Sequence, residues 1–178
     1  QARIQALQAR IRPHFLFNSI NAVLSLIRSE PKRAEQALED LADLFRVLMA
    51  DNRALAPVAK EIDIARQYLA IEELRLGPRL RVAWHVDGVP GDALVPALLL
   101  QPLVENAVYH GIEPIKGGGE IVVEIGATGG ELVIRLANPL PAAGDNHPGN
   151  RMALANIRER LQLHFDAEAR MESRVSDG

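Results

Sequence analysis

The sequence predicts an α+β protein in which an N-terminal helical hairpin precedes a mixed α/β domain. Three observations carry this prediction. Residues 1–52 show helical periodicity twice, with a break at Ser29-Glu30-Pro31. Residues 54–59, which include Pro57, interrupt the periodicity again. Beyond residue 60, helical and strand-like segments alternate, which is typical of a sheet covered by helices. We therefore expect one domain over residues 1–55 and a second over residues 60–178.

The amino-acid composition excludes several kinds of protein and site. The chain has 178 residues, of which 48% are hydrophobic and 24% charged, as in ordinary globular proteins. Its net charge of −3 argues against a nucleic-acid-binding surface. The absence of cysteine excludes disulfides and thiolate metal sites. Helical periodicity at the first residue and a strand-like segment before the last predict a fragment that is incomplete at both ends.

The first predicted helix covers residues 1–29. Ile4, Leu7 and Ile11 follow the alternating spacing of a packed seam. The next two seam positions are His14 and Asn18, just where Pro13 interrupts helical hydrogen bonding. The apolar pattern then resumes on a displaced line, at Leu16, Ile20, Val23 and Ile27.

The second predicted helix starts at Pro31, which suits a first turn, and extends to about residue 52. It has an apolar face, formed by Ala37, Leu38, Leu41, Leu44, Phe45 and Leu48. Because so thin a hairpin cannot bury this face alone, we expect two copies to form a dimeric four-helix bundle.

The remaining elements follow from periodicity and turn residues. Helices are predicted over residues 61–76, 97–110 and 152–165. Strands are predicted over residues 80–86, 120–127, 131–137 and, at the end, 169–175. Residues 138–150 contain three prolines and no periodicity, so they are predicted to form a long loop, which is usually functional or disordered.

His14 is the first candidate for chemistry. Arg10, His14 and Asn18 lie four residues apart and share one helical face, which would carry a nucleophile, a positive charge and an amide. The alternative is a structural histidine beside a proline kink, and spacing alone favours that alternative. No spacing among the other histidines suggests a metal site.

Three motifs, taken together, favour a catalytic over a structural role for His14. The first is Arg12-Pro13-His14-Phe15-Leu16-Phe17-Asn18. The second is Tyr68-Leu69-Ala70-Ile71-Glu72 with Arg75, followed by residues 99–111, which contain Gln101-Pro102-Leu103-Val104-Glu105-Asn106-Ala107. The third runs from Gly149-Asn150 to Leu161. In this order they resemble the LytS-like sensor histidine kinases, which implies a GHKL-type α/β-sandwich ATP-binding domain after the hairpin.

The resemblance assigns roles to matching residues. His14 matches the phosphoacceptor, and Asn106 matches the asparagine that holds Mg²⁺ on the ATP phosphates. His110 and Gly111 match the end of the same box. Further ATP-binding positions are implied in the later boxes, at Asn138, Gly149, Asn150 and Asn156. Mg²⁺ prefers hard oxygen ligands and keeps several waters, so one amide oxygen with phosphate oxygens suffices.

The sequence also departs from the family pattern. The usual aspartate that reads the adenine amino group is absent, and Ala137 or Asn138 takes its place. Arg151 and Ala153 replace glycines of the last box, which restricts the backbone near the phosphates. These changes predict weakened ATP binding.

The predicted function is that of the cytoplasmic kinase core of a two-component sensor. It would use ATP and Mg²⁺ to phosphorylate His14 within a homodimer, then pass the phosphoryl group to a response regulator with a LytTR-type DNA-binding output. The resemblance implies anchoring in the bacterial inner membrane through segments outside this sequence. A degenerate, non-catalytic scaffold or regulator phosphatase is the alternative. Asn18 would position a water, orient the His14 imidazole, or have only a structural role in the helix near Pro13.

Overall fold

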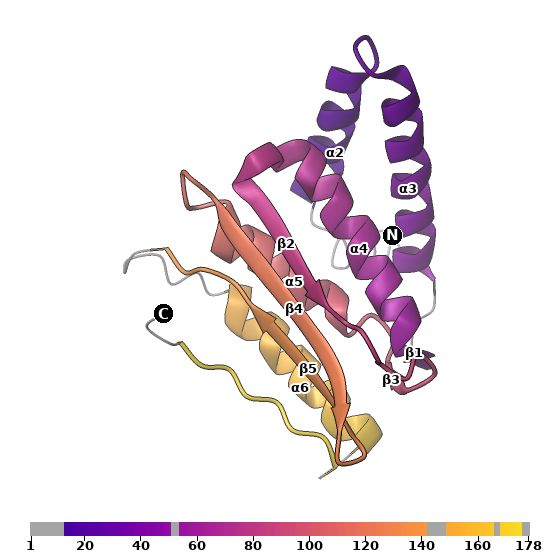
Figure 1. Ribbon diagram of the computed structural model, residues 1–178, viewed down its shortest axis with the longest axis vertical. Coiled ribbons are helices and arrows are strands. Elements are labelled where there is room, and N and C mark those ends of the chain that lie inside the picture. The colour runs from indigo at the N-terminus through magenta and orange to yellow at the C-terminus, as the bar shows by residue number, and fades with distance from the viewer. Residues whose placement is uncertain (1–12, 51–53, 142–148, 166–167, 176–178) are drawn as a thin grey trace, which may run out of the picture.

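The computed structural model describes residues 13–50, 54–141, 149–165 and 168–175. Two antiparallel helices open it, α2 (Pro13–Leu26) and α3 (Pro31–Met49). Helix α4 (Val58–Leu76) lies against both of them and leads into a short 3₁₀ turn, η1 (Gly77–Arg79). Figure 1 shows the hairpin and α4 on one side of the molecule and the sheet on the other. The α+β class is thus confirmed, with helices first and a mixed sheet after them.

The main sheet has three strands in the order β2-β4-β5. Strand β2 (Leu80–His85) is parallel to β4 (Gly119–Thr128), and β4 forms an antiparallel hairpin with β5 (Glu131–Ala137). Helices α5 (Leu100–Asn106) and α6 (Gly149–Phe165) lie behind this sheet in Figure 1. Ile121, Val123 and Ile125 alternate along β4 toward the core, as expected for a strand with one covered face.

A small ribbon was not predicted. Residues 54–59 were expected only to interrupt the helical periodicity between the two domains, but Leu55–Pro57 forms strand β1, which pairs antiparallel with β3 (Leu94–Pro96). Strands of three residues carry no readable alternation, so sequence periodicity could not reveal them. The ribbon places the start of α4 beside the segment that leads into α5, and Val58 N–H donates to Ala93 O at 2.8 Å.

Two further predictions need correction. The helix expected over residues 97–110 begins at Leu100 and continues as a π-helix, η2 (Ala107–Ile112). The strand expected over residues 169–175 was wrong, because those residues form no strand in the part of the chain that the structure describes. Its apolar and polar residues alternate, but a strand also needs hydrogen bonds from a neighbour.

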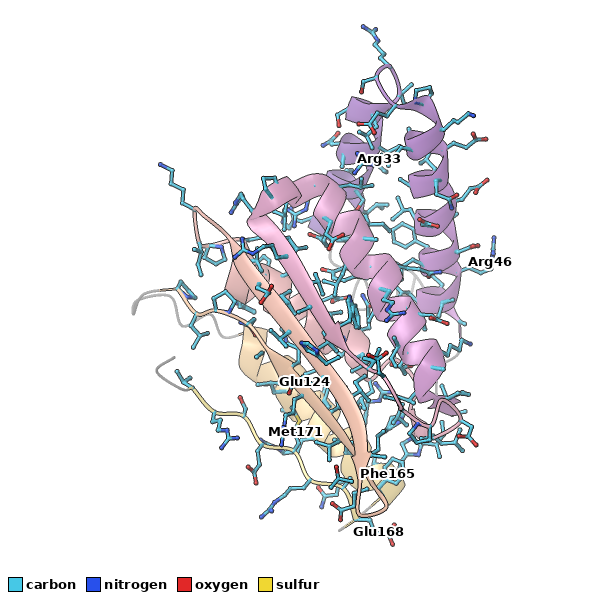
Figure 2. The ribbon with its side chains drawn as sticks, viewed as in Figure 1. Arg33, Arg46, Glu124, Phe165, Glu168 and Met171 are labelled. Carbon is cyan, nitrogen blue, oxygen red and sulfur yellow. The ribbon has the colours of Figure 1, made fainter. Side chains whose placement is uncertain are left out.

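The apolar face of α3 is buried within the chain itself. Leu41, Leu44 and Leu48 belong to a core cluster that includes Ile62 and Tyr68 of α4. A second copy is therefore not required to cover this face, contrary to the reasoning from an isolated hairpin. The outer face of α3 is charged, and Arg33 and Arg46 there make exposed ion pairs with acidic residues three positions earlier (Figure 2).

Helix α2 differs from α3 in the charge of its outer face and in the exposure of its apolar residues. Its residues 13–26 include no charged side chain of the Asp, Glu, Lys or Arg type. Val23, on the predicted displaced line, is buried against Ala34 and Ala37 of α3. The apolar residues on the outer side of α2 and the turn after it stay exposed at a spacing of three and four, namely Phe17, Ile20, Leu24 and Ile27. We call these four residues the α2 stripe.

Among the described residues, none of the helices combines the length and the apolar character that a membrane crossing requires.

Candidate functional site

His14 lies at the second position of α2 and is exposed. Its orientation follows from its neighbour, Phe15, which is only 8% exposed and packs inward. The Phe15 ring centroid lies 4.9 Å from that of Tyr68 on α4 and 6.3 Å from that of Phe45 on α3. Because Phe15 is anchored in this way, α2 presents the His14 imidazole to solvent. Arg10, the predicted cation of the same face, lies outside the described residues.

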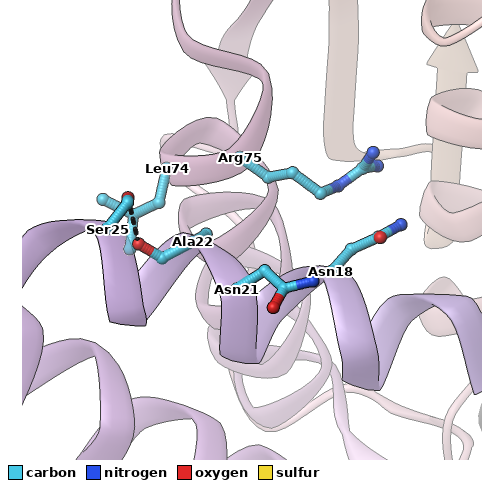
Figure 3. A pocket seen from close by; sticks show the side chains of 6 residues that line it. All are labelled: Asn18, Asn21, Ala22, Ser25, Leu74 and Arg75. Carbon is cyan, nitrogen blue, oxygen red and sulfur yellow. Dashed lines mark hydrogen bonds between the residues drawn. The ribbon is translucent and has the colours of Figure 1, made fainter.

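Asn18 lies one turn beyond His14 and is half-buried. It lines an open pocket of about 330 Å³ between α2 and the end of α4. Figure 3 shows the side chains of Asn18 and Arg75 extending from these two helices toward the same end of the pocket. Ser25 does not reach across, because its hydroxyl donates to Ala22 O of its own helix at 2.6 Å.

Asn106 is the last residue of α5 and is only 7% exposed. The π-helix starts directly after it, and the Glu113 N–H donates to Val108 O at 2.9 Å, a bond that spans five residues. Such π segments are rare and occur often at functional sites, because the extra residue per turn reorients the side chains around them. His110 lies inside this segment, with its ring edge-on to Tyr109 at a centroid distance of 4.9 Å.

Gly111 brings this helix into contact with the segment after β5. A Cβ atom at Gly111 would lie 2.9 Å from both Asn138 Cγ and Pro139 O, which leaves no room for a side chain. The Asn138 amide nitrogen donates to Pro139 O at 2.8 Å. The structure therefore places Gly111, five residues after Asn106 in the same continuous helix, against Asn138, about thirty residues later in the sequence.

The third predicted group lies on α6. Gly149 and Asn150 are the first two residues of this helix, and Asn156 is exposed on its surface. Helix α6 packs against α5 and buries Ile157. The predicted site residues therefore fall into two regions: His14 and Asn18 on α2, and the remaining residues around α5, η2 and α6.

Sequence reasoning missed two buried acidic side chains on α4. Glu61 is 2% exposed, and its carboxylate accepts N–H bonds from Leu98 at 2.7 Å and from Leu100 at 3.1 Å. Burial raises the pKa of Glu61, although these backbone bonds and Arg160 of α6 act in the opposite direction. Arg160 donates to the carbonyls of Ala97 and Leu98, so two side chains bind one turn. No local signal marked Glu61, which stands between Lys60 and Asp63 in a helix of mixed polar and apolar residues.

The second acidic side chain, Glu72, is equally buried. Its carboxylate accepts from Arg75 Nε at 3.0 Å, and the same guanidinium pairs with Glu113, just past η2. Burial raises the pKa of Glu72, Arg75 lowers it, and Glu113 raises it again. Glu72 and Arg75 belong to the second sequence motif, but only the structure shows why these two residues occur together.

The comparisons with known proteins agree with the motifs. The histidine kinase family matches residues 2–80. Sensor histidine kinase YpdA of Escherichia coli is 34% identical, over 93% of this chain and 31% of YpdA. Sensor protein LytS of Oceanobacillus iheyensis is 32% identical, over 90% of this chain and 30% of LytS. Sensor histidine kinase BtsS of Escherichia coli is 29% identical, over 90% and 29%.

The chain thus spans less than a third of the length of these curated relatives. The similarity extends through the exposed His14 helix and the α5–η2 region, the two places where the structure gathers the predicted site residues. This chain belongs to the sensor histidine kinase family of two-component signalling that includes LytS, YpdA and BtsS.

Proposed function

We propose that this chain is the kinase core of a two-component sensor, which phosphorylates His14 from ATP. The single observation that carries this proposal is the exposed imidazole of His14, in the family's phosphoacceptor motif and on a helix fixed through Phe15. Residues 1–55 would form the phosphoacceptor and dimerisation unit, and residues 60–178 the nucleotide-binding unit of GHKL type.

For this phosphoryl transfer, the main task of the protein is to position His14 and the nucleotide. A neutral imidazole nitrogen of His14 attacks the γ-phosphorus, the bond from that phosphorus to the bridging oxygen breaks, and ADP leaves. An aspartate carboxylate of the response regulator then takes the phosphoryl group from His14. Because the His14 imidazole is exposed, the γ-phosphate can approach it from solvent.

The donor set around α5 fits a magnesium nucleotide. Asn106 supplies a neutral amide oxygen of the hard kind that Mg²⁺ prefers, and His110 and Gly111 follow it in the π-helix. Bound Mg²⁺ would neutralise charge on the phosphates. Asn138, which lies against Gly111, offers an uncharged acceptor to the adenine amino group in place of the family's aspartate. Gly149, Asn150 and Asn156 would close the site from α6.

Labelling with radioactive ATP and Mg²⁺ tests the proposal. We expect a label that is lost in acid and retained in base, which is the signature of phosphohistidine, and we expect it to vanish in His14→Gln. His85→Gln is the matched control, since His85 is also exposed but lies on β2. Labelling that survives His14→Gln would show a different acceptor.

The role of Asn106 is tested separately by nucleotide binding. Asn106→Asp should weaken the binding of an ATP analogue in the presence of Mg²⁺ and leave the fold intact, because it exchanges an amide for a carboxylate of the same size. Titration with and without Mg²⁺ measures this, and an unchanged Mg²⁺-dependent affinity would remove Asn106 from the site.

The α2 stripe supports the proposal of a homodimer. Phe17, Ile20, Leu24 and Ile27 are exposed at coiled-coil spacing on α2 and the turn after it, and α2 itself has no Asp, Glu, Lys or Arg. We commit to a second copy as the partner of this face, because two such faces would pair without burying a charge. The seam residues Ile4, Leu7 and Ile11 lie outside the described residues.

Sedimentation of variants checks the dimer. Leu24→Glu should give monomers, because it places a charge in the centre of the α2 stripe. Leu38→Glu on α3 is a control with a similarly exposed leucine. Substitution of Leu41 would not be informative, since Leu41 is buried inside a single chain. A monomeric wild type would refute this part of the proposal.

Partner and branch are further parts of the proposal. The family partner is a response regulator, and we propose one with a LytTR-type output. The sequence Asn138-Pro139-Leu140-Pro141, followed by residues 149–154, resembles that of the AlgZ (FimS) alginate-regulator sensors. We propose that these sensors form a related subfamily. We also propose that further segments anchor the full-length protein in the inner membrane.

A non-catalytic scaffold is the second candidate function. The missing adenine-reading aspartate and the replaced glycines, Arg151 and Ala153, favour it. A scaffold would bind the regulator, or speed its dephosphorylation, without forming phosphohistidine. Absence of label together with intact regulator binding would select this candidate over the kinase.

A further inference from the structure

Helix α4 contacts both ends of the helix that carries Asn106. Near its start, Glu61 binds the turn at residues 97–99 that leads into α5. Near its end, Arg75 binds Glu113, the residue that follows η2. Helix α4 and the continuous α5–η2 helix therefore run in the same direction. The fourteen helical steps from Glu61 to Arg75 span about 21 Å at 1.5 Å per residue, which is close to the length of the α5–η2 helix between the two contacts.

The first contact, which we call the Glu61 contact, fixes a strained turn. Leu98 adopts φ +58°, a left-handed conformation that side chains other than glycine rarely adopt. The Glu61 carboxylate takes the N–H groups on both sides of Leu99, while Arg160 of α6 takes the carbonyls of Ala97 and Leu98. Such conformations persist only where the surroundings hold them, and here two charged side chains do so.

The second contact, which we call the Arg75 contact, holds the other end. Arg75 bridges the buried carboxylate of Glu72 and that of Glu113. Arg79, in the turn after α4, donates to Glu113 O at 3.0 Å and to Ile115 O at 3.1 Å. These carbonyls follow the end of η2, where a helix exposes its unpaired acceptors.

The two contacts have the charges that the helix ends require. A carboxylate lies at the N-terminal end of α5–η2, where unpaired N–H groups carry partial positive charge. Guanidinium groups lie at its C-terminal end, where the partial charge is negative. Helix α4 also packs on α2, through Tyr68 and Phe15, and its residue Arg75 lines the pocket beside Asn18.

We propose that the Glu61 and Arg75 contacts are positioning devices of the kinase site, which fix Asn106 along α5–η2 relative to the helix that supports His14. This inference rests on the proposed function, because it gives these side chains a role in nucleotide use. Glu61, Arg75 and Glu113 touch neither nucleotide nor phosphoryl group in this account. They act through the helix whose ends they bind.

Glu113→Gln is the main test variant. It removes one charge at a residue that is about 30% exposed, and it leaves Glu72 and Arg75 paired, so the core keeps its buried ion pair. We expect the Mg²⁺-dependent affinity for an ATP analogue to fall about fivefold or more, the lower range of measured coupling between sites. The affinity without Mg²⁺ should change little, because only the placement of Asn106 is disturbed.

Two further variants test the cause. Glu113→Asp keeps the charge and should recover part of the lost affinity, which a merely structural role for the side chain would not predict. Arg46→Gln on α3 is the control, because it breaks an exposed ion pair, that with Asp43, which is far from this helix in sequence.

Hydrogen–deuterium exchange gives a readout that needs no nucleotide. Glu113→Gln and Glu61→Gln should each speed amide exchange within residues 100–115 and leave β4 unchanged. If the wild-type chain binds no nucleotide, the proposed function fails, and exchange alone decides whether the contacts hold this helix. Unchanged exchange in both variants, or unchanged Mg²⁺-dependent affinity in a chain that binds nucleotide, would overturn the inference.

Discussion

The motif around His14 contains two phenylalanines that lie two residues apart and have opposite surroundings. Phe15 is 8% exposed and Phe17 is 64% exposed. Truncation of a buried phenylalanine typically costs about 3–5 kcal/mol, and each aromatic pair adds about 0.5–1.5 kcal/mol. Phe15 has two such pairs, with Tyr68 and Phe45, so Phe15→Ala should cost at least about 4 kcal/mol of folding stability. Phe17→Ala should change it by about 0.5 kcal/mol or less.

Urea unfolding followed by circular dichroism and by the fluorescence of Trp84 measures both variants. The chain has a single tryptophan, which lies on β2, so its signal reports on the sheet rather than on α2. Sedimentation of the same variants should show the converse effect, with dimerisation weakened in Phe17→Ala. The chain should be compared at one concentration, because dimerisation itself adds stability. Equal losses of stability from the two substitutions would refute the packing of α2 on α4.

Three further predictions follow from individual contacts. Gly111→Ala should cost about 1–3 kcal/mol of unfolding free energy by overpacking, and should weaken ATP-analogue binding, since its Cβ would lie 2.9 Å from Asn138 Cγ; normal stability and binding would contradict this contact. Because burial raises the pKa of Glu61, the folded chain binds its proton at a higher pH than the unfolded chain does. The free energy of unfolding that the Glu61 proton contributes is therefore lost as pH rises through the raised pKa, with a slope of at most about 1.4 kcal/mol per pH unit. Glu61→Gln should remove this pH dependence from urea-unfolding curves measured between mildly acidic and neutral pH. Asn18→Ala should preserve phosphorylation of His14 and slow regulator dephosphorylation if Asn18 positions a water, whereas phosphorylation itself should fall if Asn18 orients the imidazole; a variant normal in both rates leaves only a structural role.

Periodicity was sufficient to predict the long elements. The 3.6-residue pattern on α3, with Leu41, Leu44 and Leu48 inward, and the alternation on β4 each depend on one covered face, which the sequence records directly. The roles proposed for Asn106 and His14 come only from the sequence motifs. In the local sequence pattern, nothing separates either residue from an ordinary asparagine or histidine. Physical reasoning from the sequence alone therefore favoured a structural role.

What the sequence could not show were the contacts between distant segments. Glu61 binds residues 37 and 39 positions away, and Arg75 binds Glu113 across 38 positions. Nothing local distinguishes Glu61 from a solvated acidic residue in the first turn of a helix, which is the commoner case. The π-helix was missed for a related reason, because the extra residue in its turn depends on how both ends are held rather than on local propensity.

The position of α3 exposes a limit of reasoning about one element at a time. The hairpin was expected to need a second copy because two helices leave an apolar face uncovered. A third helix from the same chain, α4, covers that face, and the core cluster runs without a break from Leu44 through Tyr68 to Val104. The surface left for a partner is therefore a different one, the α2 stripe, on the helix that carries His14. Because α4 packs on α2 and also binds both ends of α5–η2, a shift of α2 in the proposed dimer would be transmitted through α4 to the helix that carries Asn106.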